Sequence, residues 1–276
     1  MKKIISLTMV SILFLTMLTG CQSKKEDVLK VGMDLKFPPF TYMDDNSKPA
    51  GLEVDIANAL GEYLGKKVEI VNTDFSMLIP ALDTGEIDIV INDMTIQKER
   101  KEKVDFSSPY IYGRTLALLN KDWAAKNNIT DKTTPEELFS KGGRVVGLVG
   151  TISVTVPQSY GVEVKEMTEI ASALMEINNG TADILVGADT IIGDHYAYPD
   201  TTQIYWGMPE VSESAMAVKK GNSELLEKAN DFIATMYEKD GLYSKLAPKY
   251  DKAIGEYLKD DSLGLDYIIN KPTVNQ

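Results

Sequence analysis

Several charged and hydroxyl side chains in this sequence could bind a small zwitterion. Arg100 carries a planar guanidinium that can make two parallel hydrogen bonds to a carboxylate, and the hydroxyl of Thr95 could donate to the same group. A free amino acid needs both of its charges met once it leaves water. Arg100 also lies in a charged stretch, Lys98–Lys103, which is equally typical of a solvated surface.

Two phenylalanines could line an apolar slot beside such a carboxylate site. Phe37 lies in Lys36–Phe40, where two prolines predict a loop, and it is therefore less easily assigned to a core. For Phe75 ordinary core packing is the alternative. Thr151 follows Gly150 at a predicted strand-to-helix junction, where free N–H groups favour an anion or where it simply caps the helix.

Catalytic and metal chemistry find little support in the sequence. One histidine and one cysteine exclude a Cys/His zinc site in practice. His195 beside Asp194 could belong to a hydrolytic triad, but no Gly-x-Ser-x-Gly elbow exists to present a nucleophile. The segment 147–151 lacks the lysine of a phosphate-binding loop. We expect no catalytic residues, no metal and no cofactor.

The N-terminus predicts export and a lipid anchor. Two lysines precede the apolar run Ile4–Leu18, which is too short to span a bilayer comfortably. The ending Leu18–Cys21 resembles a bacterial lipobox, in which the cysteine becomes the first mature residue and carries the lipid. Cys21 is the only cysteine, so no intramolecular disulfide can form. The alternative is a plain thiol beside a cleaved signal.

The charge and the length limit the partners and the domains. The formal charge is −12, and loss of Lys2 and Lys3 with a 1–21 signal peptide makes it −14. Such an acidic surface repels nucleic acid, so we expect no nucleic-acid partner, and we expect a monomer. Residues 22–27 are typical of a flexible tether. The remainder is long enough for two lobes of roughly 100–150 residues each.

Strands and helices alternate through the rest of the chain. This alternation predicts right-handed βαβ units and a parallel sheet with helices on both faces. The same order recurs after residue 144, and the helix–Gly–two residues–Asp–strand pattern of 81–90 is echoed at 176–185. A shared connection could produce this echo alone. The expected strands are Val28–Gly32, Val68–Val71, Ile87–Ile91, Arg144–Val149 and Ala182–Val186. The expected helices are Gly51–Leu64, Met77–Leu82 with a cap at Gly85, one that begins at Thr151, Thr168–Asn178, Ser223–Tyr237 and Gly241–Tyr250.

Two short apolar stretches, Thr115–Leu119 and Ser214–Val218, could cross between two lobes. Two crossing strands would form a hinge with a cleft between the lobes. We therefore predict an α/β fold of two hinge-linked lobes. Its parts are lobe 1 at 28–116, lobe 2 at 117–213, a return segment of lobe 1 at 214–250, and a helical or irregular tail at 251–276.

A series of short motifs follows in order between about Leu29 and Tyr250. They are Asp34–Phe40, Gly51–Ala57, Leu78–Leu82, Met94–Arg100, Val104–Tyr110, Ala217–Asn222 and Asp240–Tyr243. In order and spacing they resemble the amino-acid-binding proteins of bacterial ABC importers, the family 3 solute-binding proteins. The resemblance implies the type II periplasmic-binding-protein fold. It also implies an extracytoplasmic subunit, held to the membrane through Cys21, that delivers an amino acid to permease subunits.

The resemblance also implies roles for individual residues. Arg100 and Thr95 would hold the ligand carboxylate with Thr151, and an aromatic slot would take the ligand side chain. Asp34 would face that side chain, unless it is a turn or capping aspartate. The complete set of expected ligand-binding residues is Asp34, Phe37, Phe75, Asn92, Asp93, Thr95, Arg100, Thr151 and Asp189.

Three positions depart from the family pattern. Ile152 stands where many members carry a second small hydroxyl residue, so one hydrogen bond to the carboxylate is expected to be missing. Asp93 stands where members often have Ser or Gly, and a carboxylate there could select a cationic or hydroxyl-bearing ligand. The aspartate for the α-amino group falls on Asp189, with Asp194 as the alternative.

These residues favour binding over catalysis. We expect capture of an amino acid, with polar or basic side chains favoured by Asp34 and Asp93. One alternative is an enzyme of the same fold, such as a cyclohexadienyl-type dehydratase, in which Asp93 would act as a general acid. A ligand-sensing lipoprotein without an importer is the other.

Overall fold

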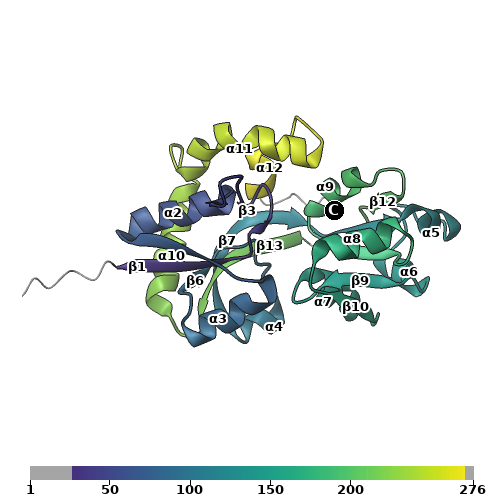
Figure 1. Cartoon of the computed structure of the whole chain (residues 1–276), viewed down its shortest axis with the longest axis horizontal. Helices are drawn as coiled ribbons and strands as arrows, with labels where there is room; N and C mark the ends of the chain where they lie inside the picture. Colours follow the sequence, from purple (N-terminus) through teal and green to yellow (C-terminus); the bar gives the residue numbers. More distant parts are fainter. Residues whose placement is uncertain (1–26, 210, 271–276) are drawn as a thin grey trace, which may run out of the picture.

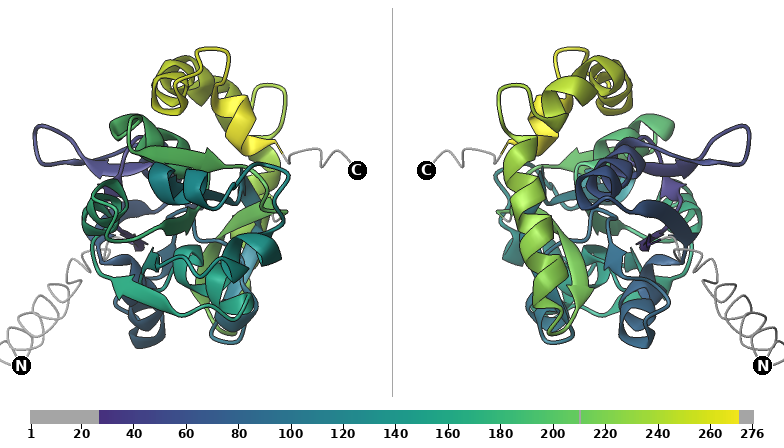
Figure 2. Two further views of the ribbon diagram at one scale, coloured as in Figure 1. Left: turned by 90° about the vertical axis from the view of Figure 1, so that its right-hand side faces the viewer. Right: turned by 90° about the vertical axis from the view of Figure 1, so that its left-hand side faces the viewer.

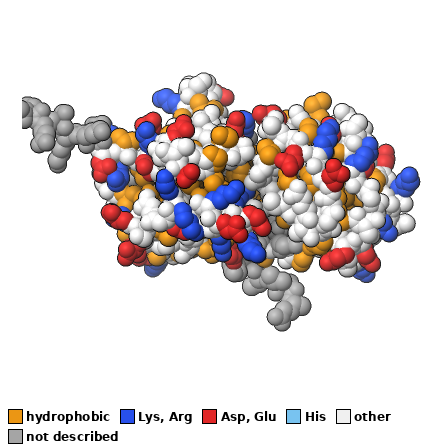
Figure 3. Space-filling view, turned by 90° about the horizontal axis from the view of Figure 1, so that it is seen from below, with side chains coloured by type: hydrophobic (Ala, Val, Ile, Leu, Met, Phe, Trp, Pro, Cys, Tyr) orange, Lys and Arg blue, Asp and Glu red, His pale blue; other side chains and the backbone are white. Residues whose placement is uncertain are grey.

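The computed structural model describes residues 27–209 and 211–270, which form two lobes side by side (Figure 1). The predicted signal peptide, Cys21 and most of the tether lie outside the described residues. Within these residues no helix is both long and apolar enough to cross a bilayer. On the face seen in Figure 3, acidic and basic side chains are interspersed over both lobes.

The first lobe is built on a sheet with the strand order β5-β1-β6-β13-β7. The strand β1 pairs in parallel with β5 and β6, whereas β13 runs antiparallel to β6 and β7. The expectation of a parallel sheet is therefore wrong at β13, because a strand that returns from the other lobe enters the sheet from the opposite end. The bounds are β1 Val28–Met33, β5 Lys67–Asn72, β6 Ile89–Val90, β7 Val104–Arg114 and β13 Val211–Lys219.

Helices cover both faces of this sheet (Figure 1). The helix α2 buries the predicted side chains Ile56 and Leu60 in the core, but Tyr63 from the same predicted face is 49% exposed. The helix α3 ends at Gly85, whose φ of 76° confirms the predicted cap. The helices are α2 Leu52–Leu64, α3 Leu78–Thr84, α4 Lys98–Lys101 and α10 Ser223–Met236, with a 3₁₀ turn, η1, over Phe75–Met77.

A small three-stranded sheet follows β1 and reaches the gap between the lobes. It consists of β2 (Lys36–Phe37), β3 (Thr41–Met43) and β4 (Pro49–Ala50). The prediction of an irregular loop at Lys36–Phe40 is therefore wrong in part. Lys36 and Phe37 pair with β3 because the prolines, which lack an N–H donor, come only after them in the turn.

The second lobe repeats this architecture with the strand order β10-β9-β11-β8-β12. Again the core strands β9, β10 and β11 are parallel, whereas β8 is antiparallel to β11 and β12. Its strands are β8 Leu116–Asn120, β9 Val145–Leu148, β10 Val164–Met167, β11 Ile184–Gly187 and β12 Thr202–Tyr205, and its helices are α5 Lys121–Lys126, α6 Pro135–Ser140, α7 Ile152–Ser159, α8 Ile170–Asn178 and α9 Thr190–Ala197.

Two connections join the sheets. The strand β7 ends at Arg114 in the first sheet and β8 begins at Leu116 in the second. On the return, β12 ends at Tyr205 and β13 begins at Val211. The stretch Ser214–Val218 thus lies wholly inside β13 of the first sheet, so the return crossing precedes it. The predicted lobe boundaries at 116/117 and 213/214 stay a proposal, although Leu116 pairs within the second sheet and residues 211–213 pair within the first.

The C-terminal part of the described chain is helical. The helix α11 runs over Leu242–Leu258, beyond the predicted end at Tyr250, and α12 covers Leu265–Ile269. Figure 2 shows these two helices, in yellow-green and yellow, at the top of the molecule in both views. Because α11 contacts both α2 of the first lobe and α9 of the second, the segment predicted as a tail connects the two lobes.

Replacing Gly51 with alanine is expected to destabilise the fold strongly. Gly51 precedes α2 with φ 121° and ψ 170°, a region open essentially to glycine alone, and a Cβ there would lie 2.1 Å from the carbonyl oxygen of Phe40. We expect urea unfolding to show a loss of about 3 kcal/mol. The matched control is Gly65→Ala, where φ is 67° and no atom lies within 4 Å of the added Cβ. It should cost only about 1 kcal/mol, and equal losses would contradict this account.

Candidate ligand-binding site

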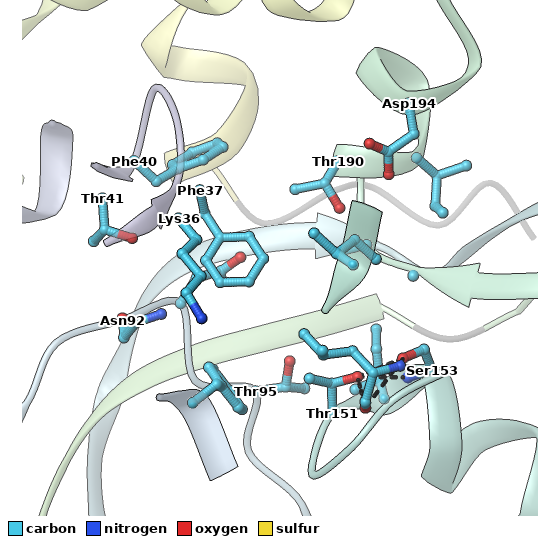
Figure 4. A pocket seen from close by; sticks show the side chains of 18 of the residues that line it. Lys36, Phe37, Phe40, Thr41, Asn92, Thr95, Thr151, Ser153, Thr190 and Asp194 are labelled. Carbon is cyan, nitrogen blue, oxygen red and sulfur yellow. Dashed lines mark hydrogen bonds between the residues drawn. The ribbon is translucent and has the colours of Figure 1, made fainter. Parts of the chain in front are cut away.

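A cavity of about 260 Å³ lies between the two lobes. In Figure 4, Phe37, Asn92 and Thr95 lie on one side of it and Thr151, Ser153, Thr190 and Asp194 on the other. Pockets for drug-sized ligands measure roughly 300–1,000 Å³, so this volume suits a smaller solute. Its two walls come from different lobes, so closure of the lobes would enclose a ligand.

Arg100 and Lys36 are the cationic side chains among the described residues that line the cavity, and Arg100 is the more deeply buried of the two. It lies in the short helix α4, is 6% exposed and donates from Nη1 to the carbonyl oxygen of Thr95 at 2.7 Å. Its Nη2 donates across the gap to the carbonyl oxygen of Gly150 in lobe 2. Burial lowers its pKa to about 10, with Asp93 opposing, so the guanidinium is charged at neutral pH. Two of its five N–H groups are used in this way, which leaves donors for a carboxylate.

The loop after β6 supplies two polar groups of the same wall. The side-chain oxygen of Asn92 accepts a hydrogen bond from the backbone N–H of Asp34, and Asn92 is buried. The hydroxyl of Thr95 lies 3.1 Å from that of Ser212 in β13. Asn92 and Thr95 both line the cavity. They follow the carboxyl end of β6, and α/β proteins commonly bind ligands at the carboxyl ends of their strands.

Aromatic rings form the apolar part of the cavity. Phe37 and Phe75 both line it, as the sequence predicted. The guanidinium carbon of Arg100 lies 5.3 Å from the centroid of the Phe75 ring, within range of a cation–π contact. Phe40 and Tyr257 also line the cavity and were not predicted. Phe40 lies in the same aromatic–proline segment as Phe37, but no sequence signal connected Tyr257, far along the chain, with this site.

Two hydroxyl groups of lobe 2 line the cavity just after Gly150, whose carbonyl oxygen accepts from Arg100. Thr151 is the N-cap of α7, and its hydroxyl donates to the carbonyl oxygen of Leu148 at 2.8 Å and lies 2.5 Å from the hydroxyl of Ser153. All three of these residues line the cavity, together with Ile152. Ser153 was missed in the sequence, where the Thr-x-Ser spacing at a helix start was the available signal. Ser153 thus places a second hydroxyl group one residue after Ile152, the position at which the family pattern led us to expect one.

Two neighbouring carboxyl groups, the fully buried Glu53 and the half-buried Asp93, lie in the lobe 1 wall. Glu53 is fully buried, and its Oε1 accepts from the backbone N–H of Asp93 at 2.6 Å and from the hydroxyl of Tyr110. Among the described residues its Oε2 has no hydrogen-bond partner. Burial, and then the charge of Asp93, raises the pKa of Glu53 to about 8, and burial raises that of Asp93 to about 6. Both line the cavity, although the sequence indicated a ligand role only for Asp93.

Asp34 lies behind the cavity wall rather than on it. Its Oδ2 accepts from the backbone N–H of Phe75 at 3.1 Å, whereas its buried Oδ1 has no partner among the described residues. Burial raises its pKa. In this arrangement Asp34 positions Phe75 and Asn92, and its direct contact with a ligand stays a prediction.

The two alternative aspartates of lobe 2 occupy different places. Asp189 accepts from the backbone N–H of Arg114 at 3.0 Å and from the hydroxyl of Tyr267 at 3.4 Å, and it does not line the cavity. Asp194, one turn further along α9, does line it (Figure 4), and burial raises its pKa to about 7. The neighbouring His195 turns its Nδ1 to the hydroxyl of Thr202 at 2.8 Å. The structure therefore places the alternative residue, rather than the first choice, on the wall.

Unliganded stability should fall with rising pH because of Asp194. Its folded pKa of about 7 exceeds the unfolded value of about 3.9, so between these values the folded state binds more protons and loses stability as the pH rises. From pH 4 to 8, urea unfolding should show wild type losing about 2 kcal/mol relative to Asp194→Asn, after discounting for partial exposure. Parallel pH profiles of the two proteins would contradict the burial of this carboxylate.

Comparison with known proteins identifies a family. Residues 29–253 match the sequence profile of "Bacterial extracellular solute-binding proteins, family 3". The L-cystine-binding protein TcyJ of Escherichia coli (strain K12) is 33% identical over 229 residues, 82% of this chain and 84% of the relative. An L-arginine-binding protein of Pseudomonas aeruginosa is 28% identical over 258 residues, 91% and 96% of the two chains.

Solved structures show the same fold. The ancestral amino-acid-binding protein AncCDT-1, described as a precursor of cyclohexadienyl dehydratase, matches with a TM-score of 0.68 and 33% identity, over 82% of this chain and 95% of the other. An ancestral arginine-binding protein bound to glutamine matches with a TM-score of 0.67 and 35% identity, over 79% and 95%. The predicted two-lobed periplasmic-binding-protein fold is thereby confirmed.

Proposed function

Because this chain belongs to the bacterial extracellular solute-binding proteins of family 3, we propose that it is the substrate-binding subunit of an ABC importer and captures an amino acid for delivery to the permease. The observation that carries the proposal is the cavity between the lobes, with the Arg100 guanidinium on one wall and the Asp194 carboxylate on the other. A zwitterion has the complementary pair of charges.

The ligand carboxylate binds at Arg100. The guanidinium offers the N–H groups that Thr95 and Gly150 do not use, and the Thr95 hydroxyl lies on the same wall. From lobe 2, the first turn of α7 adds a favourable dipole, and the hydroxyl groups of Thr151 and Ser153, which bond each other and the carbonyl oxygen of Leu148, become donors to the carboxylate only if ligand binding rearranges them. Groups from both lobes thus contact one carboxylate, and this links binding to closure.

The ligand ammonium binds at Asp194, and the side chain extends between the two phenylalanines toward Asp93 and Glu53. With a pKa of about 8, Glu53 is protonated at neutral pH, so its buried carboxyl group with the unpartnered Oε2 needs either a hydrogen-bonding partner or a nearby cation that shifts it to the ionised form. A cationic or hydrogen-bonding side chain supplies one, so we favour polar and basic amino acids. The names of relatives that bind cystine, arginine and histidine support this class.

The location follows from the N-terminal sequence. We propose that Cys21 carries a lipid which holds a monomeric protein at the outer face of the cell membrane, with residues 22–27 as a tether. Two-chain anchoring is stable, whereas a single acyl chain binds only reversibly. Transfer of the ligand then needs only diffusion of the closed protein along the membrane to its permease.

A dehydratase of this fold is the second candidate, favoured by the pKa of about 6 for Asp93, which suits a general acid. Incubating the protein with a cyclohexadienyl amino acid and following product by absorbance distinguishes the two functions. Turnover would establish the enzyme, whereas binding without turnover supports the importer subunit.

A thermal-shift screen of the twenty common amino acids tests the proposed function. A ligand at 100 times its Kd stabilises the folded state by about 2.7 kcal/mol, which raises Tm by several degrees in a protein of this size. We expect at least one polar or basic amino acid to do so, and isothermal titration to show one site per chain. A flat screen, confirmed by titration, would refute amino-acid capture.

A further inference from the structure

The helices α11 and α12 extend the site beyond the region that matches the family, which ends at residue 253. The helix α11 is fixed to lobe 1, because the hydroxyl of Tyr250 donates to Oδ2 of Asp55 in α2 at 2.8 Å. The helix α12 folds back on α11, where the backbone N–H of Leu265 donates to Oδ1 of Asp251 at 2.9 Å. From this base α11 reaches α9 of lobe 2, and α12 packs on β7 close to the N-terminus of α9 (Figures 1 and 2).

Tyr257 of α11 lies on the wall of the ligand cavity. Its hydroxyl donates to the carbonyl oxygen of Thr190 in α9 at 3.0 Å. Its ring meets that of Phe40 edge-on, with centroids 6.2 Å apart, and packs so closely on Gly193 that a Cβ there would lie 2.7 Å from its Cε2. One side chain therefore contacts lobe 1, lobe 2 and the cavity.

Tyr267 of α12 makes a second connection at the hinge. Its hydroxyl accepts from Nη1 of Arg114 at 2.6 Å and lies 3.4 Å from Oδ1 of Asp189. The backbone N–H of Arg114 donates to Oδ2 of the same aspartate at 3.0 Å. The N-cap of α9 is thus held by the end of β7 and by α12 together. The same helix carries Asp194.

We propose that Tyr257 and Tyr267 make the C-terminal helices a functional part of the ligand site. The ring of Tyr257 limits the size of the ligand, and both hydroxyl groups fix α9 so that Asp194 faces the cavity. Both residues lie beyond residue 253, where the family match ends, and they would act as determinants of specificity and closure in this chain. The part of this inference that concerns amino-acid ligands rests on the proposed function.

Titration of L-serine, L-arginine and L-tryptophan into a set of tyrosine variants tests this inference. Tyr257→Phe loses one hydrogen bond and should raise Kd about fivefold. Tyr257→Ala also widens the cavity, so the ratio of the Kd for L-tryptophan to that for L-serine should fall. Tyr267 does not line the cavity. The variant Tyr267→Phe should therefore raise each Kd by the same factor and leave the ratio of the two Kd values unchanged. The matched control is Tyr63→Phe on α2, 49% exposed, which should match wild type.

Affinities and ratios equal to wild type in all three variants would overturn the inference. Circular dichroism identifies a variant that fails to fold, and Tyr257→Phe then carries the test as the mildest change.

Small-angle scattering of the unliganded protein separates this inference from the proposed function. If no amino acid binds to wild type, the proposed function fails. The radius of gyration of the double variant Tyr257→Phe/Tyr267→Phe then decides whether the two tyrosines connect the lobes. A larger radius than wild type supports the connection between the lobes, and an equal radius refutes it.

Discussion

Replacing Arg100 with alanine is expected to abolish amino-acid binding. Arg100 is 6% exposed. Among the described residues that line the cavity, Lys36 is the only other lysine or arginine that could replace its charge. Lys36 is itself paired with Asp74 at 2.9 Å and Glu169 at 3.3 Å. Removing one partner of a buried charged contact costs about 3–5 kcal/mol, or a factor of roughly 10² to 4 × 10³ in Kd.

The conservative change Arg100→Lys makes this test sharper. It keeps the positive charge but loses the planar fork and the cation–π contact with Phe75. We expect an intermediate loss, about tenfold to a hundredfold. Isothermal titration provides both values, and circular dichroism and Tm show that each variant is folded. Wild-type affinity in Arg100→Ala would place the ligand carboxylate elsewhere.

Replacing Asp194 with asparagine should have the second largest effect on affinity. Its carboxylate is the one that α9 presents to the cavity, and the variant would leave a ligand ammonium without its counter-charge. We expect Kd to rise about a hundredfold, since a charge-assisted hydrogen bond and a buried charge pair are lost together. Asp189→Asn is the matched comparison, because Asp189 is bound to Arg114 and Tyr267 instead.

Ligand analogues distinguish the roles of these two aspartates. An analogue without the α-amino group should bind equally well to wild type and Asp194→Asn, because neither complex contains the contact between an ammonium group and the Asp194 carboxylate. Asp189→Asn should weaken amino acid and analogue by the same modest factor, through the position of α9. If Asp189→Asn instead abolished the preference for the amino group, the first choice from the sequence would be right and the placement argued from the cavity wrong.

The affinity of the site should also depend on pH. The carboxylate of Asp194 must be ionised to hold an ammonium, and its unliganded pKa of about 7 implies that binding at pH 6 includes the release of a proton. Buried carboxyl groups that lack partners also cost folding stability, and a cationic ligand relieves part of that cost. We therefore expect the occupant of the site to carry positive charge.

Much of the fold could be predicted because its signals are local. The buried face of α2, the Gly85 cap of α3 and the two sets of apolar strands follow from periodicity and glycine placement. The antiparallel strands β8 and β13 could not be predicted in this way. Their direction depends on the path of the chain between lobes, and an apolar run carries no sign of its direction.

The site was predictable where a short motif carried it. Arg100 and Thr95 lie in the motif Met94–Arg100, Thr151 follows a glycine at a predicted helix start, and all three line the cavity. The choice between Asp189 and Asp194 was not predictable, since both lie on one short helix and only its tilt in the folded lobe decides which side chain faces inward. Tyr257 was out of reach for a different reason, because its contact with Thr190 joins segments 67 residues apart.

Titration of one bound amino acid against two of its analogues tests the central claim most directly. One analogue lacks the α-carboxylate and the other lacks the α-amino group. If Arg100 and Asp194 hold the two charges of a zwitterion from opposite walls, each analogue should bind at least about a hundredfold more weakly than the amino acid. An analogue that binds as tightly as the amino acid would show that the cavity does not recognise a zwitterion.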